Sequence, residues 1–329
     1  KSYTLKQTGG IDLLYNPSQA LNLQLTANPD FAQIEADPFS FNISKYESYY
    51  SEKRPFFTQG NEIFMPSGKE SNSGFYSPLE FFYSRRIGRK LPDGQEVPLI
   101  FGAKASGRNN GLEFGGFTAY TGDVKYYDDD SLLHEKSALF TALRLKQQIL
   151  SNSTIGLLFV GKSDDETVNG LLNLDGAFRG SSWQLAYQIA GSIEDRFKDF
   201  AFSSGFKYNG ESFLTGIRTR FIGRHFDVSS VGFVPWKGTA EYVSYSGPVW
   251  KYNTGKVRSL FLYTGPTLFY DYEDRFTDYG LLIGINMQMR SNWGFELSSS
   301  YARTKDDGVL YHSYDMSLSS WFNTHPSYS

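Results

Sequence analysis

The most regular feature of this sequence is an alternation of hydrophobic and polar residues that runs through most of the chain after residue 75. Alternation with a period of two places successive side chains on opposite faces of a β-strand. One stretch carries Leu281, Ile283, Ile285, Met287 and Met289 on one face, and Leu282, Gly284, Asn286, Gln288 and Arg290 on the other. Similar stretches begin at Leu139, Trp183, Phe213 and Trp293. The pattern predicts an all-β protein built from amphipathic strands.

The length of the strands and the rhythm of their connections indicate the class of β protein. The predicted strands have about 10 to 14 residues, whereas strands of globular proteins usually have about 5 to 6. From residue 107 onward, short turns alternate with longer polar loops. The longer loops are expected at 122–135, 162–166, 193–199, 222–241, 271–275 and 303–309. Outer-membrane barrels share this rhythm, so we predict an antiparallel up-and-down transmembrane β-barrel of about 16 or more strands.

The composition supports an apolar outer and a polar inner surface. Aromatic residues make up 17% of the chain, but all hydrophobic residues together reach only 40%, and the mean hydropathy is −0.40. No apolar run approaches the ~20 residues that a membrane-spanning helix needs. The net charge of −3 gives no basic surface for nucleic acid, and the lack of cysteine excludes disulfides and thiolate chemistry. Because the chain starts at Lys1 without a leader, we expect a processed protein or an excised piece.

Residues 28–74 interrupt the alternation. If turns and loops alternate strictly, this segment starts at the long-loop end and finishes at the opposite end, and a strand at 75–88 then runs outward. We therefore interpret residues 1–329 as a single barrel domain. Within it, residues 28–74 would form one strand, best placed at 39–45, and an inward-folded loop or plug.

Charged residues concentrate in and just after this segment. The predicted lumenal charge cluster consists of Glu35, Asp37, Glu52, Lys53, Arg54, Arg85, Arg86 and Arg89. One interpretation is a constriction that selects solutes, as rings of charge do in pores. The other is a network of ion pairs that holds the loop against the wall, because buried carboxylates need such partners. Arg85 and Arg86 are adjacent on a predicted strand, so one of them is expected at an interface or in a bulge.

A second group of basic residues lies on the polar faces of predicted strands. The lumen-facing members are Arg144, Lys146, Arg218, Arg220 and Arg290. Inward acidic residues such as Glu113, Asp175 and Glu296 are fewer. A weakly cationic lumen would favour anionic or polar solutes, although mixed charges can also serve only to solvate the interior.

No arrangement of residues in the sequence indicates catalysis. The four histidines are scattered without metal-ligand spacing, and no nucleophile elbow, P-loop or dinucleotide fingerprint is present. Glu35 and Asp37 are two residues apart on one strand, which is too parallel to flank a glycosidic bond. Acidic loop runs such as Asp128–Asp130 lack the spaced ligands of a calcium loop. We predict no catalytic residue, no metal site and no cofactor, and hence no enzyme.

Three blocks of sequence resemble a known family. They are NPDFAQIEADP from Asn28, YYSEKRPFFTQGNEIF from Tyr49 and FFYSRRIGR from Phe81, and VGFVPWKGTAEY from Val231 is also similar to a family segment. The chain resembles a Bacteroidota-type domain-of-unknown-function family of outer-membrane β-barrels. Its members usually lie C-terminal to a family-9-like carbohydrate-binding domain. That domain is absent here, and the chain ends at HPSYS where family members look longer, so the resemblance also implies an incomplete barrel as an alternative.

The functional expectation combines these observations. We predict a barrel of the bacterial outer membrane for the passage or docking of polar solutes, with carbohydrate-derived solutes suggested by the resemblance. Its expected partners are outer-membrane lipid or lipopolysaccharide and, as a candidate ligand, a saccharide. One alternative is a non-conducting scaffold or assembly barrel of an envelope complex. A second alternative is a soluble β-rich carbohydrate-binding or hydrolytic domain, because a sandwich has the same alternation with its apolar face inward.

Overall fold

A single curved sheet forms most of the molecule in the computed structural model, which describes residues 9–29, 46–69, 75–129, 131–273, 275–306 and 308–322. Fifteen strands pair antiparallel in chain order, apart from the separate two-stranded sheet of β5 and β6. The fifteen strands are β1 (Ile11–Ser18), β2 (Leu21–Ala27), β3 (Leu99–Asn109), β4 (Leu112–Thr121), β7 (Ala138–Ile149), β8 (Ser153–Ser163), β9 (Val168–Arg179), β10 (Trp183–Glu194), β11 (Arg196–Asn209), β12 (Phe213–Ile222), β13 (Thr239–Lys251), β14 (Val257–Asp271), β15 (Phe276–Met289), β16 (Trp293–Asp306) and β17 (Val309–Phe322). The all-β, up-and-down architecture expected from the alternation is confirmed.

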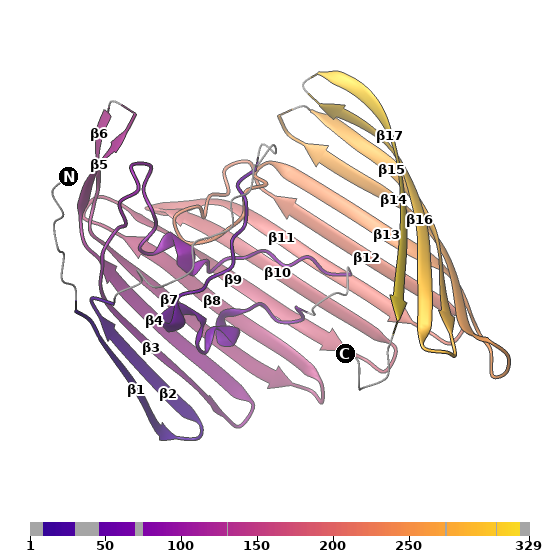
Figure 1. Ribbon diagram of the computed structural model, residues 1–329, viewed down its shortest axis with the longest axis horizontal. Helices are drawn as coiled ribbons and strands as arrows, with labels where there is room; N and C mark the ends of the chain where they lie inside the picture. The colour runs from indigo at the N-terminus through magenta and orange to yellow at the C-terminus, as the bar shows by residue number, and fades with distance from the viewer. Residues whose placement is uncertain are drawn as a thin grey trace, which may run out of the picture.

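The sheet curls into an open trough whose two edges are β1 and β17 (Figure 1). Short turns connect the strands at one end, which we call the short-turn end. At the other end, the long-loop end, lie the hairpin of β5 (Val124–Asp128) and β6 (Ser131–Glu135) and the loop 223–238. None of the helices in the described ranges has the length and apolar composition needed to cross a membrane.

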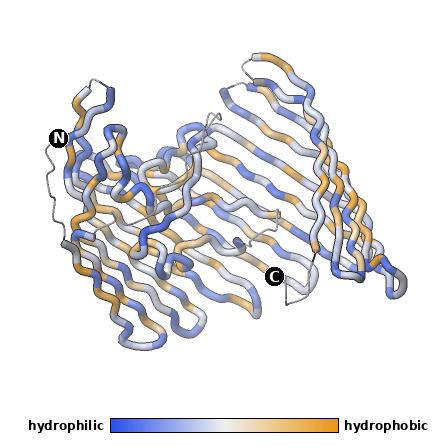
Figure 2. Tube along the Cα trace, in the orientation of Figure 1, coloured by the Kyte–Doolittle hydropathy of each residue, from blue (hydrophilic) through white to orange (hydrophobic). Residues whose placement is uncertain are grey.

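Apolar side chains lie on the convex face and polar side chains on the concave face over much of the sheet. In β7, Leu139, Leu143 and Leu145 are exposed, whereas the intervening Ala142 and Arg144 are buried. Ile283 of β15 is 55% exposed. Figure 2 shows apolar and polar positions alternating along the strands. This polarity is the reverse of a soluble sandwich, in which the apolar faces pack together.

Several expected loops at the long-loop end are tight turns, because the strands continue through polar residues. The connection expected at 193–199 reduces to a turn at Asp195, whose φ of 57° allows Glu194 and Arg196 to pair directly. The connection expected at 303–309 is also short, because β16 ends at Asp306 and β17 begins at Val309, and its Gly308 has φ 81°. The polar residues at these positions predicted loops. They form strands instead, because hydrogen bonds between strands join backbone groups and do not depend on side-chain polarity.

The described residues 46–69 and 75–98 of the long connection between β2 and β3 lie inside the trough. We call residues 28–98 the insert; its described parts are 28–29, 46–69 and 75–98. Its regular elements are α1 (Pro55–Thr58), η1 (Asn61–Phe64) and η2 (Ser84–Arg86). Because β2 pairs directly with β3, the insert leaves the sheet and returns to it at the long-loop end.

This arrangement corrects one prediction about the insert. Residues 75–88 do not form a strand of the sheet; they contain η2 and a single β-bridge between Glu80 and Phe233. The prediction that residues 28–74 run from the long-loop end to the short-turn end stays a prediction, because residue 74 lies outside the described residues. The strand expected at 39–45, and the candidate residues Glu35 and Asp37, lie outside the described residues.

Candidate functional site

The insert packs an aromatic core against the concave face of the sheet. Phe56, Phe57 and Phe64 of the insert belong to one buried cluster with Phe117 of β4. The ring centroids of Phe82 and Phe117 are 5.2 Å apart. The sheet positions under this core are often alanine, with Ala119, Ala142, Ala190 and Ala201 at or near zero exposure. Small side chains on the wall leave the space that the phenylalanine rings of the insert fill.

A buried ion pair of the wall fixes the middle of the insert. Arg144 of β7 and Asp175 of β9 form an ion pair whose side chains are both 0% exposed. Asp175 also accepts a hydrogen bond from the backbone N–H of Ser67 at 2.9 Å. Arg144 donates to the backbone carbonyls of Ile63 and Met65 at 3.3 and 3.2 Å. We predicted that Arg144 faces a lumen. Instead, its ion pair with Asp175 is buried under the insert.

Other polar side chains of the wall bind the backbone of the insert in the same way. Gln188 of β10 accepts from the N–H of Leu79 at 2.7 Å and donates to its carbonyl at 3.2 Å. Ser203 of β11 donates to the carbonyl of Ser77 at 2.7 Å. Lys104 of β3 donates to the carbonyl of Phe56 at 2.7 Å. Lys146, predicted to face a lumen, donates to the carbonyl of Glu62 at 3.2 Å.

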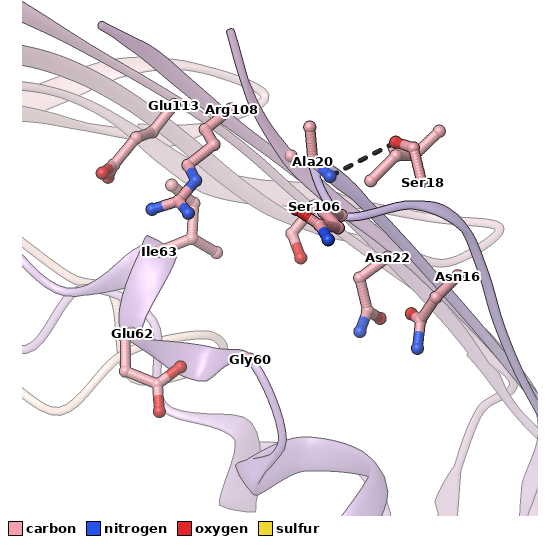
Figure 3. A pocket seen from close by; sticks show the side chains of 13 residues that line it. Asn16, Ser18, Ala20, Asn22, Gly60, Glu62, Ile63, Ser106, Arg108 and Glu113 are labelled. Atoms are coloured by element: carbon pink, nitrogen blue, oxygen red, sulfur yellow. Dashed lines mark hydrogen bonds between the residues drawn. The ribbon is translucent and has the colours of Figure 1, made fainter.

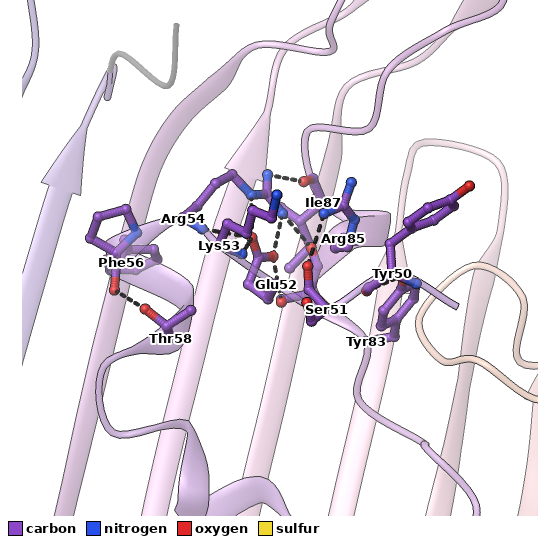
Figure 4. A network of polar contacts seen from close by, with 12 residues as sticks. Tyr50, Ser51, Glu52, Lys53, Arg54, Phe56, Thr58, Tyr83, Arg85 and Ile87 are labelled. Carbon is purple, nitrogen blue, oxygen red and sulfur yellow. Dashed lines mark hydrogen bonds and ion pairs between the residues drawn. The ribbon is translucent and has the colours of Figure 1, made fainter. Parts of the chain in front are cut away.

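A compact cluster of polar contacts ties two parts of the insert together (Figure 4). The Glu52 carboxylate pairs with the Arg54 guanidinium at 2.7 Å and accepts from the Ser84 hydroxyl at 2.6 Å. Arg54 donates to the backbone carbonyls of Ile87 and Ser84 at 2.7 and 2.9 Å. Burial acts to raise the pKa of Glu52, but the hydrogen bonds and charge of Arg54, with Ser84, hold that pKa below its ordinary value. The cluster is therefore built around an ionised carboxylate.

The remaining predicted charges of the insert also serve as clamps. Arg86 makes a two-pronged ion pair with Glu47, at 2.8 and 2.6 Å. Arg85 donates to the carbonyl of Ser51 at 3.0 Å, and Arg89 pairs with Glu135 of β6 at 2.7 Å. Both Arg85 and Arg86 belong to η2, so the expectation that they point to opposite faces of a strand is wrong. Lys53 takes part through its backbone N–H, which donates to Glu52 at 3.0 Å.

The loop 223–238 closes over the insert from the long-loop end. Phe233 donates its N–H to the Glu80 carbonyl at 2.8 Å, and Tyr83 donates its N–H to the Val231 carbonyl at 2.9 Å. The ring of Phe233 lies 5.2 Å from that of Tyr49 and 5.4 Å from that of Tyr83. Burial and the Glu80 carboxylate raise the pKa of Tyr49 to about 12, so its hydroxyl remains protonated at neutral pH.

The basic residues predicted further along the sheet have local partners. Arg218 and Arg220 on β12 both pair with Glu241 of β13, at 2.7 and 2.6 Å, and Arg220 stacks on Trp236 of the loop 223–238. Arg290 was predicted to face a lumen. Instead it follows the last residue of β15 in an exposed turn and donates to the carbonyl of Gly255 at 2.9 Å.

Two adjoining cavities remain between the insert and the short-turn end. Their volumes are about 810 and 1070 Å³, and they share Gln19, Ala20, Arg108 and Glu113. Figure 3 shows the first cavity, with Arg108 and Glu113 on the wall side and Glu62 of η1 across from them. Asn16, Asn22 and Ser106 continue the polar wall. Among the described residues no ion pair joins Arg108 to Glu113, and the Glu113 carboxylate lines the second cavity together with Lys146.

The side chains that line these cavities are mainly charged groups, amides and hydroxyls. Within the described ranges, no group of three or more histidine and acidic residues could hold a metal ion. The residues that anchor the insert from the wall were only partly visible in the sequence. Asp175 was noted as an inward acidic residue without a role, and Gln188 and Ser203 carried no signal beyond their polar position in an alternating strand.

One family model covers almost the whole chain. Residues 1–315 match the family described as domain of unknown function (DUF5916). The chain belongs to this family. A search of the curated proteins found no match. Membership in DUF5916 agrees with the expectation of a domain-of-unknown-function family, and the signature blocks near Tyr49, Phe81 and Val231 are the segments that contact one another around Phe233.

Proposed function

We propose that this DUF5916 chain forms the wall of a β-barrel in a bacterial outer membrane, with the insert held inside it. The observation that carries the proposal is the reversed polarity of the sheet. Leucines and isoleucines cover the exposed convex face, while Arg144, Asp175, Gln188 and Ser203 are buried on the concave face. An apolar surface of this extent is unfavourable in water, and lipid or the acyl chains of lipopolysaccharide would cover it.

Inside this barrel, the insert restricts the path of polar solutes. The cavities at the short-turn end present Arg108, Glu113, Asn22 and Glu62, a mixed set of charges and amides that suits polar solutes of either charge. The resemblance to Bacteroidota barrels that accompany carbohydrate-binding domains suggests carbohydrate-derived solutes. The proposal assigns the chain passage or docking of such solutes and no enzymatic step.

The membrane part of the proposal is tested by solubility and gel migration. We expect the protein purified from bacterial membranes to require detergent, because its convex face is apolar. If its sheet is closed in the membrane, it should also migrate differently on semi-native gels before and after heating. A chain that refolds as a soluble monomer without detergent would contradict the proposal and favour the soluble carbohydrate-binding alternative.

A non-conducting scaffold is the second candidate, and the number of anchors on the insert favours it. A matched pair of glutamines on β10 separates the two candidates. Gln188 binds both backbone groups of Leu79, whereas the side-chain nitrogen of Gln184, also buried and on the same face, has no partner among the described residues. If the insert gates a passage, Gln188→Ala should increase conductance in planar bilayers and Gln184→Ala should not. If neither variant conducts, the scaffold interpretation is the better one.

A further inference from the structure

Three arginines that were predicted to face a lumen have carboxylate partners on the concave face. Arg144 pairs with Asp175, and both Arg218 and Arg220 pair with Glu241. A charge that is paired in this way acts only weakly on a solute. The basic groups that can attract a solute therefore lie elsewhere on the concave face.

A second group of basic side chains lies at the short-turn end without carboxylate partners. Arg108 of β3, Lys146 of β7 and Arg179 of β9 all line the larger of the two cavities, about 1070 Å³, which we call the short-turn cavity. Lys146 donates to the backbone carbonyl of Glu62 and Arg179 to that of Asn152, both at 3.2 Å. A neutral carbonyl does not cancel the charge of its donor, and within the part of the chain that the structure describes none of the three forms an ion pair.

One carboxylate lies among these basic groups. Glu113 of β4 is opposite Arg108 on one neighbouring strand and opposite Lys146 on the other. Directly opposite residues point to the same face of a sheet, so the three side chains form one row on the wall. Figure 3 shows Arg108 and Glu113 of this row with their charged ends toward the insert. With three basic groups and one carboxylate, the lining of the short-turn cavity has an excess of two positive charges.

We propose that the short-turn cavity binds the negatively charged group of an acidic saccharide fragment, either a carboxylate or a sulfate ester. The saccharide part of this inference rests on the proposed function, and the anionic part rests on the excess positive charge. Guanidinium groups such as those of Arg108 and Arg179 bind oxyanions through two parallel hydrogen bonds. Gln148 and Thr154, which also line the cavity, provide donors and acceptors for sugar hydroxyls.

Binding can be measured by isothermal titration calorimetry with the purified protein, in detergent where the protein requires it. The probes are a tetrasaccharide of galacturonic acid, a sulfated tetrasaccharide and a neutral tetrasaccharide of galactose. We expect at least one acidic probe to bind about tenfold or more tightly than the neutral probe, and its Kd to rise with salt concentration. The two acidic probes show which anionic group is preferred. Equal binding of all three probes, or no binding of either acid, would overturn the inference.

Four substitutions locate the bound anion. Arg108→Gln and Arg179→Gln should each raise the Kd of the acidic probe about tenfold, because each removes a charged hydrogen-bond donor. Glu113→Gln should lower this Kd about threefold, because it removes the one carboxylate of the lining. The matched control is Arg258→Gln, since Arg258 is exposed near the start of β14, at the same end of the sheet but outside the cavity. An effect of Arg258→Gln as large as that of Arg108→Gln would reduce the binding to general charge attraction and contradict a specific site.

Failure of this inference can be distinguished from failure of the proposed function. If the protein stays soluble without detergent, the proposed membrane function fails, but the titrations still report whether the cavity binds an acidic saccharide. If the protein requires detergent and the acidic probes bind no better than the neutral one, only the present inference fails.

Discussion

Asp175 on the wall and Ser67 on the insert are joined by a hydrogen bond of 2.9 Å between groups 108 positions apart in the sequence. The same carboxylate is paired with Arg144, and neither side chain of the pair is exposed. A buried ion pair is stable only when its remaining hydrogen-bonding groups are satisfied. Here the backbone of the insert supplies the missing partners, so the wall and the insert stabilise each other.

Replacing Asp175 with Asn should loosen the insert and lower the stability of the whole domain. Arg144 would keep its charge in a buried site without a counter-charge, a change that costs about 3–5 kcal/mol in typical proteins. We expect a lower free energy of unfolding in urea and faster proteolysis within residues 46–98. Lys198→Gln is the control, because the ion pair of Lys198 with Glu194 is partly exposed and should contribute less than about 1 kcal/mol. Equal effects of the two substitutions would show that the buried pair has no special role.

Two adjacent glycines of β4 give a direct test of contact between wall and insert. A Cβ at Gly115 would lie 2.9 Å from Cγ2 of Ile63, whereas a Cβ at Gly116 would face outward, 3.8 Å from its nearest neighbour, Leu143. Gly115→Ala should therefore cost about 1–3 kcal/mol through overpacking, and Gly116→Ala should be close to neutral. Urea unfolding of both variants measures the difference. A neutral Gly115→Ala would mean that η1 does not press on the sheet at this point.

Two carboxylates of the insert should give its stability opposite pH dependences. Folding lowers the pKa of Glu52. Its contribution to the free energy of unfolding is therefore complete above the ordinary glutamate pKa of about 4.3. This contribution is lost as the pH falls through the lower pKa of the folded state. Burial raises the pKa of Glu80, whose side chain is 27% exposed, despite the nearby Lys69. The contribution of Glu80 to the free energy of unfolding is complete below about pH 4.3. It is lost as the pH rises through the higher pKa of the folded state.

Proteolysis of residues 46–98 at a series of pH values measures both effects. Glu52→Gln should reduce the acid-induced release of the insert, which Asp175 and Glu135 also oppose, and Glu80→Gln should reduce the loss of protection on the alkaline side of pH 4.3. A release profile that neither substitution alters would assign the pH dependence to other groups.

The apolar convex face predicts different results for two exposed leucines. Leu143, 54% exposed, lies in the middle of β7, whereas Leu150, 80% exposed, lies in the short turn that follows. If the convex face contacts lipid, Leu143→Arg should cost up to about 2–4 kcal/mol and reduce insertion into liposomes, while Leu150→Arg should have little effect. In a water-soluble protein both substitutions should stay within about 0.5 kcal/mol of the parent. Liposome flotation and urea unfolding distinguish the two cases.

The fold could be predicted to a large extent from local sequence, but the insert could not. Strands such as β7 and β15 could be predicted because the face of the sheet to which a side chain points alternates with a period of two residues. This alternation is visible in the sequence of each strand alone. The segment 75–88 has aromatic residues suited to a strand, yet its backbone binds Gln188, Ser203 and the loop 223–238 instead of neighbouring strands. No local pattern distinguishes these two sets of partners.

The roles of the charges were decided in the same way. Sequence position put Arg144, Lys146, Arg218 and Arg220 on the polar faces of their strands. It also suggested an ion-pair network in which basic residues such as Arg54 pair with Glu35 and Asp37. The alternation of side chains along this chain by itself determined an antiparallel sheet with one apolar and one polar face. Only the tertiary structure decided that β2 pairs with β3 across the 71 intervening positions 28–98, and that the polar face packs against an insert instead of lining an open channel. The physical reason is that strand faces follow from neighbours in the sequence, whereas a buried donor or acceptor takes whichever partner the folded chain brings to it.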